Sequence, residues 1–502
     1  MRGTIQLAKL KRIWRSRKEV FLPLVLIGVG LFYLLTIREG HDWGGDFSMY
    51  LQHAENLATG RPYSETPFVQ VPEIADAVGP SAYPPVFPVA LAPVFLARGG
   101  PDLGAMKAVV VVFFVLFLLA VAAVLDRRSS RDQVALLVVL VGASPYFWGI
   151  KDQVLSDIPF ACFIYLTLWL AEMSYADSTP RSRRWGLSIL VGLTVYLATG
   201  TRSLGLALVP ALMLYEALRF RKLPLHALAS SAIAFTLLAV QRAVVGVTGS
   251  PLTSFRFDPI GVMANFFQYA FSLKNLFWNG YINGVAVVVW LAVSALAVYG
   301  FRLRLRAGYS LLEIFTVVYL IPVLLWPYYQ GIRFLIPIVP LYFYYALAGF
   351  SAFRTRLAPP LATRAAVAIG AAVFGSYIAG YSRTTYTHVS GGISEEGAVA
   401  LFDYLRANRR DSDVYVFFKP RVLAYFARAR SAMDYQTEDR AELWDYYGRV
   451  GATHLIVREG DGFWEERVRA APSRFVEVYR NPDFSIYQLA GTAVAPDAGD
   501  YR

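Results

Sequence analysis

The chain has 502 residues, of which 56% are hydrophobic and 17% charged, and its mean hydropathy is +0.43. A soluble globular core does not need this much apolar sequence, so the composition excludes an ordinary soluble protein and predicts an all-α polytopic membrane protein. The net charge of +12 would suit nucleic-acid binding. However, the basic residues stand in short connectors, where they would face anionic lipid headgroups. We therefore expect membrane lipids, and no nucleic acid, as partners.

Apolar runs long enough to span a membrane recur along residues 1–381. A bilayer core of about 30 Å requires ~20 helical residues. The sequence predicts eleven spans, near residues 20–37, 104–125, 133–148, 158–174, 186–200, 203–218, 227–245, 281–301, 311–327, 334–350 and 364–381.

The positions of Lys and Arg predict the orientation, because short cytoplasmic loops retain positive charge. The first twenty residues are rich in both, which indicates a cytoplasmic amino terminus. Counting spans from there puts the other basic clusters on the same side, beginning at Arg127, Arg181, Arg219, Arg302 and Arg354. We expect a multi-pass protein, anchored by an uncleaved first span, in a bacterial cytoplasmic membrane.

Two long loops are expected on the outer face, at 38–103 and 246–280. The segment Tyr83–Arg98 is apolar but short and rich in proline, so it predicts an interfacial helix and not a span. An amphipathic stretch, Asp46–Thr59, precedes it. Loops of this length within a compact protein usually carry function.

The composition changes after residue 381, where charges of both signs become frequent. We expect two domains, a membrane domain over 1–381 and a small extracytoplasmic α/β domain over 382–502. Strand-like runs at 414–418, 454–458, 475–479 and 484–489 alternate with helix-like stretches at 395–408 and 441–450. This second domain is interpreted as a cap or an acceptor-docking element.

Ionisable residues collect at the expected outer boundary. A carboxylate within a span would cost about 2.5 to 3.5 kcal/mol, and few are found there. Asp46 and Asp157 stand at this boundary with the cations Arg202, Lys274 and Arg333. Carboxylates facing cations suit a reaction at a lipid phosphate, in which a base activates an acceptor and Arg or Lys binds the leaving phosphate.

No Cys or His cluster has metal-ligand spacing, so the sequence indicates no particular cofactor. A divalent metal stays open, although no motif points to one. The single cysteine, Cys162, lies within an expected span, so nothing indicates disulfides.

Four segments together resemble a known family. They are GGDFSMYLQHAENLATGRPY (residues 44–63), YPPVFPV (83–89), VLSDIPF (154–160) and RFLIPIVPLY (333–342). Their order and spacing are similar to those of the membrane glycosyltransferases of the GT-C superfold, in the branch of the aminoarabinose-lipid A and protein mannosyltransferases. Members of that family transfer a sugar from a polyprenyl phosphate at the extracytoplasmic face. The large β-trefoil insertion of the protein mannosyltransferases is absent from this sequence.

The resemblance implies roles for individual residues. Asp46 would be the catalytic carboxylate of an inverting transfer to a cell-envelope acceptor, and Asp157 the second catalytic acid. The residues expected to bind substrate, by resemblance or by position at the outer boundary, are Tyr50, His53, Tyr83, Arg202, Lys274 and Arg333.

Other interpretations remain open. Asp46 and Asp157 could cap helix starts, Arg202 and Arg333 could extend to headgroups, and His53 could be structural. At the level of the whole protein, the alternatives are a flippase of lipid-linked intermediates and a non-catalytic assembly subunit.

Overall fold

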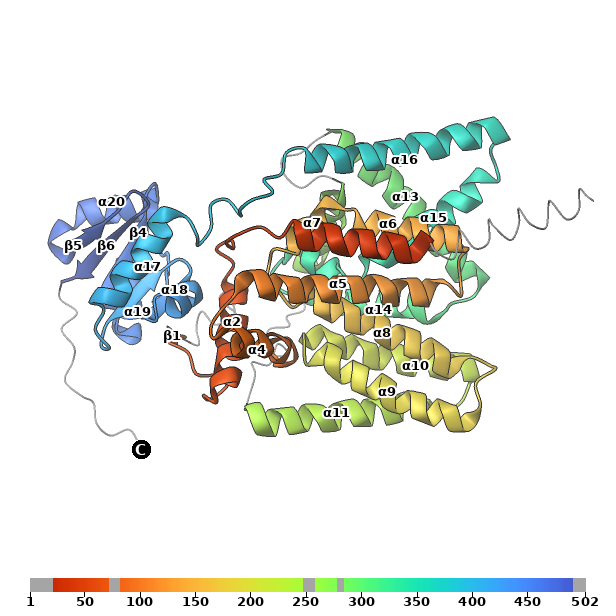
Figure 1. The fold of residues 1–502 in the computed structure, drawn as a ribbon, viewed down its shortest axis with the longest axis horizontal. Coiled ribbons are helices and arrows are strands. Elements are labelled where there is room, and N and C mark those ends of the chain that lie inside the picture. Colours follow the sequence, from red (N-terminus) through yellow and green to blue (C-terminus); the bar gives the residue numbers. More distant parts are fainter. Residues whose placement is uncertain (1–20, 72–81, 247–257, 278–283, 491–502) are drawn as a thin grey trace, which may run out of the picture.

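The computed structural model describes residues 21–71, 82–246, 258–277 and 284–490. The basic residues of the first twenty positions and parts of the expected 246–280 loop and 281–301 span lie outside these ranges. Long helices lie side by side in a bundle, and a mixed α/β unit stands at one end of it (Figure 1). The expected fold class, mainly helical with a small C-terminal strand region, is confirmed.

The bundle is made of helices that follow the expected spans. They are the helix Phe21–Leu35, α5 (Leu103–Leu125), α6 (Arg131–Gly142), α7 (Pro145–Ile150), α8 (Asp157–Tyr175), α9 (Arg181–Thr199), α10 (Leu208–Phe220), α11 (Leu225–Val245), α13 (Gly284–Ala307), α14 (Leu311–Leu325), α15 (Val339–Arg354) and α16 (Pro359–Tyr381). The expected span 133–148 is divided between α6 and α7, because Pro145 has no N–H to continue the helical ladder.

Six helical segments among the described residues are long and apolar enough to cross a membrane. The total of eleven spans stays a prediction. α11, α13 and α16 bury little of their surface inside the protein. Large side chains such as Val244, Val288 and Ile378 are therefore exposed on them. Long apolar helices with large exposed apolar side chains suit lipid and not water, and the chain is an integral membrane protein.

The two helices expected in the 38–103 loop, α2 (Gly45–Thr59) and α4 (Val86–Arg98), lie at one end of the bundle. The structure adds elements at this end that the sequence did not predict: α12 (Pro259–Ser272) and the short 3-10 helices η2 (Ser203–Ala207), η4 (Leu273–Leu276) and η5 (Gly331–Leu335). α2 and α4 pack against each other beside the α/β unit (Figure 1).

The α/β unit contains a six-stranded sheet in the order β1-β3-β2-β4-β6-β5. β1 to β4 pair in parallel, and β6 and β5 add antiparallel hairpin strands. The strands are β1 (Phe68–Val69), β2 (Val414–Phe417), β3 (Arg430–Met433), β4 (His454–Arg458), β5 (Phe475–Arg480) and β6 (Phe484–Leu489). The helices of the unit are α17 (Glu396–Asn408), α18 (Pro420–Phe426), α19 (Arg440–Val450), α20 (Gly462–Ala470) and the 3-10 turn η6 (Pro472–Arg474).

The edge strand β1 belongs to the 38–103 loop and not to the C-terminal part of the chain. Phe68 and Val69 pair with Ser431 and Ala432 of β3. The sequence predicted four of the strands but neither β1 nor β3. β1 has only two residues, and the β3 sequence RSAM lacks the β-branched residues that mark strands.

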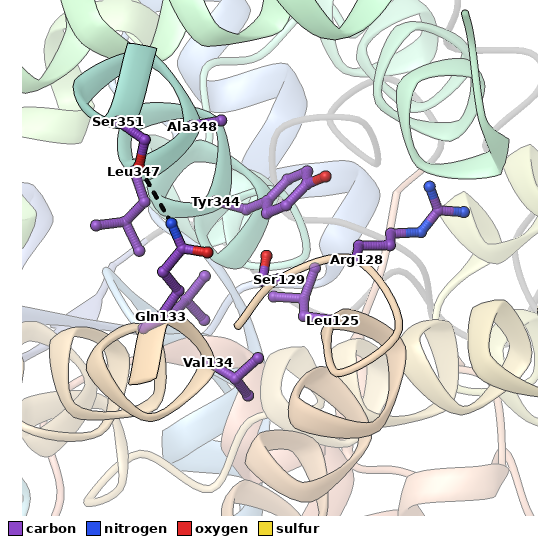
Figure 2. A pocket seen from close by; sticks show the side chains of 10 residues that line it. Leu125, Arg128, Ser129, Gln133, Val134, Tyr344, Leu347, Ala348 and Ser351 are labelled. Atoms are coloured by element: carbon purple, nitrogen blue, oxygen red, sulfur yellow. Dashed lines mark hydrogen bonds between the residues drawn. The ribbon is translucent and has the colours of Figure 1, made fainter. Parts of the chain in front are cut away.

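A cavity of about 190 Å³ opens at the opposite end of the bundle, beside the turn between α5 and α6 (Figure 2). Arg128, Gln133, Tyr344 and Ser351 are among its lining residues. Arg128 also forms an ion pair with Glu172 on α8. Glu172 is fifteen residues after Asp157, so at 1.5 Å per residue about 22 Å of helix separate the two ends.

α13 and α15 approach each other closely through glycine. A Cβ added to Gly300 of α13 would lie 1.9 Å from the carbonyl oxygen of Tyr345 on α15. Gly370 on α16 has no atom within 4 Å of the same position.

We expect Gly300→Ala to destabilise the protein by about 1–3 kcal/mol, because the two helices must move apart. Gly370→Ala should leave stability unchanged or slightly higher, since alanine favours helix. Thermal unfolding in detergent measures both, and equal midpoints would contradict the close approach of α13 and α15.

Candidate active site

The two carboxylates singled out in the sequence begin two helices at the same end of the bundle. Asp46 lies in the first turn of α2, and Asp157 is the first residue of α8. The partial positive charge of a helix N-terminus favours a carboxylate there by about 0.3–1 kcal/mol. Neither side chain caps its helix, because neither N-cap position, Gly44 or Ser156, shows a side-chain cap bond and both carboxylates point elsewhere. The capping interpretation is therefore wrong for both.

Arg333 of η5 joins the two carboxylates. Its Nη2 donates to Asp46 Oδ2 at 3.1 Å and to Asp157 Oδ2 at 3.0 Å. Arg202, in the turn between α9 and η2, donates to the other oxygen of Asp157. These four residues lie far apart in the sequence, and the structure brings them together.

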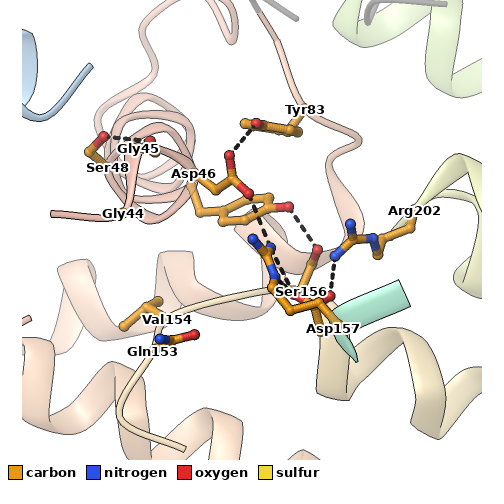
Figure 3. Close-up of polar contacts among 12 residues, drawn as sticks. Gly44, Gly45, Asp46, Ser48, Tyr83, Gln153, Val154, Ser156, Asp157 and Arg202 are labelled. Atoms are coloured by element: carbon orange, nitrogen blue, oxygen red, sulfur yellow. Dashed lines mark hydrogen bonds and ion pairs between the residues drawn. The ribbon is translucent and has the colours of Figure 1, made fainter. Parts of the chain in front are cut away.

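Tyr83, just before α4, also contacts Asp46. Its hydroxyl donates to Asp46 Oδ1 at 2.7 Å. Figure 3 shows Asp46 on α2 between Tyr83 and the end of α8 that carries Asp157, with Arg202 directed at Asp157.

A fifth charged residue comes from the α/β unit. Arg421 of α18 donates from Nη1 to the Tyr83 hydroxyl at 2.9 Å, and the same atom lies 3.8 Å from Asp46 Oδ1. No motif in the sequence pointed to Arg421 as a site residue. The only local signal is a proline, Pro420, that starts a helix after a buried strand. This signal does not distinguish Arg421 from the other arginines of the C-terminal part of the chain.

Exposure differs sharply between the two carboxylates. The Asp157 side chain is 2% exposed, whereas that of Asp46 is 31% exposed and that of Arg333 26% exposed. Asp46 and Arg333 are therefore open to a substrate, and Asp157 lies behind the two arginines that it holds.

The electrostatic environment keeps Asp46 ionised. Burial by itself would raise the pKa of this carboxyl, but the charges of Arg333 and Arg421 and the hydrogen bond from Tyr83 outweigh it and hold the pKa well below its ordinary value. Three arginines surround two carboxylates in this group. With all five side chains ionised, the cluster carries a net charge of +1, that is, three minus two.

Tyr50 and His53 are buried and contact the segments that carry Asp157 and Tyr83. The Tyr50 hydroxyl is hydrogen-bonded to Ser156 Oγ at 2.7 Å, and burial raises the pKa of Tyr50 to about 12. His53 has Nδ1 2.9 Å from the Tyr63 carbonyl and Nε2 3.2 Å from the Tyr83 amide. Both ring nitrogens are thus used by backbone, which fixes the segment that carries Tyr83. Burial lowers the pKa of His53 to about 4, so the ring is neutral at pH 7.

Lys274 is not brought to the cluster. Its ammonium donates to Asn275 Oδ1 at 2.9 Å and lies over the ring of Phe271 on α12. Within the described ranges, no group of three or more His, Cys, Asp or Glu side chains could hold a metal ion.

Comparison with known proteins finds similarity in structure only. No family model matches the sequence, and no curated protein matches it. ArnT from Cupriavidus metallidurans, solved with bound undecaprenyl phosphate, is 12% identical with a TM-score of 0.58. The match covers 94% of this chain and 99% of that chain.

The Archaeoglobus fulgidus oligosaccharyltransferase, solved with Zn and sulfate, is 13% identical with a TM-score of 0.61, over 92% of this chain and 72% of that chain. An oligosaccharyltransferase AglB, also from Archaeoglobus fulgidus and solved in complex with an inhibitory peptide and a dolichol-phosphate, has a TM-score of 0.60 at 13% identity, over 96% of this chain and 75% of that chain. The chain therefore has the GT-C fold of these proteins.

The shared contacts of Asp157 predict a large loss of stability on its removal. Asp157→Asn leaves Arg202 and Arg333 without their common counter-charge, and breaking a buried pair costs about 3–5 kcal/mol. Thermal unfolding should show this loss. Asp177→Asn is the control, because Asp177 pairs with Arg219 while 87% exposed and should have little effect. Equal midpoints for the two variants would contradict the anchoring role of Asp157.

Proposed function

We propose that the chain is an inverting glycosyltransferase that moves a sugar from a polyprenyl-phosphate donor to a cell-envelope acceptor at the outer face of the membrane. The observation that carries this proposal is the cluster itself. An accessible carboxylate and an accessible arginine are held together at a loop-rich end of an apolar bundle. A lipid phosphate and its acceptor would meet at such a boundary.

The charge balance of the cluster favours an anionic substrate. Its net charge of +1 matches the single negative charge of a phosphodiester donor. Arginine binds phosphate oxygens through pairs of N–H groups, so Arg333 and Arg202 are the groups suited to the donor phosphate. Lipid phosphate ligands are present in two of the similar structures, ArnT and AglB.

The proposed transfer is a single displacement at the anomeric carbon. A nucleophilic oxygen or nitrogen of the acceptor forms a bond to the anomeric carbon, and the bond from that carbon to the phosphate oxygen breaks. The electron pair goes to the polyprenyl phosphate, which leaves with one additional negative charge. The acceptor proton goes to Asp46, the exposed carboxylate of the pair.

The low pKa of Asp46 makes it a weak base before the donor binds. Arg333 already pairs with Asp46 and Asp157. As negative charge develops on the leaving phosphate, Arg333 gains a further anionic partner, and its attraction to Asp46 weakens. The basicity of Asp46 then rises when the acceptor must lose its proton. Asp157 acts in this scheme by holding Arg202 and Arg333, and not as a second base.

The distribution of basic residues supports the orientation. Because α5, α10, α13 and α15 all run away from the cluster end, their carboxyl ends place Arg127, Arg219, Arg302 and Arg354 at the far end of the bundle. With positive charge on the cytoplasmic side, the cluster and the α/β unit lie outside.

The transporter alternative is less well supported. A coupled transporter uses ionisable groups near the middle of the membrane. In the described spans such groups lie at the two ends, as Asp157 and Glu172 do on α8.

Replacing Asp46 with Asn keeps the size of the side chain but removes its basicity. We expect Asp46→Asn to lower the rate of transfer by about 10²–10⁴-fold. A panel of synthetic undecaprenyl-phosphate sugars supplies the donor, an envelope fraction supplies the acceptor, and mass spectrometry measures released undecaprenyl phosphate and the new glycoside. Asp42→Asn is a matched control, because Asp42 binds Gln153 and the Gly44 amide and not the cluster.

Transfer by Asp46→Asn at the parental rate would remove Asp46 from the reaction. Movement of the lipid across a vesicle membrane, with no new glycosidic bond, would favour the flippase.

A further inference from the structure

The contact between α18 and the first outer loop places a residue of the α/β unit in the carboxylate cluster. The Arg421 side chain is 2% exposed, although it comes from the unit that stands outside the bundle. Its guanidinium lies over the rings of Phe68 and Tyr83, at 5.3 and 5.4 Å from their centroids. The arginine is thus held between the edge strand β1 and the tyrosine that binds Asp46.

The surrounding sheet fixes the position of Arg421. α18 connects β2 to β3, which are neighbouring parallel strands. β1 extends the same sheet, and the Ser431 amide also donates to the Pro67 carbonyl at 3.2 Å. The strands on both sides of α18 and the strand from the 38–103 loop therefore belong to one sheet, which holds Arg421 in place against that loop.

A second ion pair joins the same two parts away from the cluster. Arg428, just after α18, donates to Glu55 of α2 at 2.7 and 2.9 Å. Glu55 is nine residues after Asp46, which is about 14 Å along the helix. Two arginines therefore connect the α/β unit to α2, but only Arg421 reaches Asp46. Substitution of Arg428 therefore tests the docking of the α/β unit alone, whereas substitution of Arg421 tests docking together with a direct effect on Asp46.

We propose that Arg421 is a positioning residue of the transfer reaction, which holds the Tyr83 hydroxyl against Asp46, so that the α/β unit completes the active site. The proposal rests on the glycosyltransferase function proposed above. Arg421 acts through Tyr83, since the tyrosine hydroxyl accepts a hydrogen bond from the arginine and donates one to Asp46. A fixed carboxylate matters because a misplacement of about 1 Å can reduce a rate by ~10².

The charge of Arg421 also acts on Asp46. The groups that face Asp46 are Arg333 from η5, Arg202 from the turn before η2, Arg421 from α18, Tyr83 from the segment before α4, Asp157 from α8 and Tyr50 from α2 itself. Burial alone raises the pKa of Asp46, and Arg421 is among the charges that reverse the effect. Without this arginine the carboxylate would take up a proton at a higher pH.

The test compares Arg421→Gln, Arg421→Lys and Arg428→Gln in the full-length purified protein. The donor is whichever undecaprenyl-phosphate sugar the parent turns over. We expect Arg421→Gln to lower kcat by about 10–100-fold with little change in KM for the donor. The acidic limb of the kcat/KM profile, which in the parent lies below the ordinary titration range of a carboxyl, should move to higher pH in this variant. Arg421→Lys should restore the acidic limb and part of the rate, because it restores the charge.

Arg428→Gln serves as the matched control. It breaks the other ion pair between the same two parts, and it should retain the parental kcat and pH profile with a lower thermal midpoint. If Arg421→Gln behaves like Arg428→Gln, then Arg421 is a docking contact only and the proposal is overturned.

Three further outcomes are decisive. If Arg421→Gln does not fold, Tyr83→Phe interrupts the same link from the membrane side, and a parental rate for that variant would overturn the proposal. A parent that releases undecaprenyl phosphate from no donor contradicts the glycosyltransferase function itself. An active parent with an unaffected Arg421→Gln variant contradicts only the role of Arg421.

Discussion

The ion pairs of Arg333 with two carboxylates are the interaction on which the rest of the site depends. Charges that leave water at the edge of an apolar bundle must be paired, and the pairing is effective only if the partners are held in place. Arg333 meets this requirement by contacting Asp46 and Asp157 with one guanidinium. α2, α8 and η5 are thereby fixed to one another. The same arrangement leaves an excess positive charge at the surface where a lipid phosphate would arrive.

Burial divides the two carboxylates into different roles. Asp157 is enclosed and saturated by Arg202 and Arg333, which makes it a counter-charge that keeps two cations in position. Asp46 is the exposed member of the pair. A site built in this way presents an ionised carboxylate beside an exposed arginine, and in the proposed reaction that arginine would bind the phosphate. These are the two requirements of displacement at an anomeric carbon bound to phosphate.

The loop over residues 38–103 contacts both the helical bundle and the C-terminal sheet. Residues 45–59 and 82–98 pack on the end of the bundle, while Phe68 and Val69 between them add a strand to the C-terminal sheet. The loop therefore connects the membrane part and the α/β unit through backbone hydrogen bonds as well as through Arg421 and Arg428. The boundary at residue 381 that the composition suggested marks a change in sequence character. The sheet itself crosses this boundary, because its edge strand comes from before residue 72.

The sequence by itself determined the membrane class and the course of the helices. It also singled out Asp46, Asp157, Arg202 and Arg333 as candidate site residues. The length of an apolar run, a basic connector and an isolated charge are local properties of the sequence. The bilayer requires apolar runs of a certain length and favours Lys and Arg on one side, so these features can be read without the fold. Only the tertiary structure decided which of these charges meet, that Lys274 stays apart from them, and that Arg421 joins them. The physical reason is that an ion pair depends on distance in space. The partners of Asp46 come from positions 83, 202, 333 and 421, and nothing in their local sequence encodes that convergence.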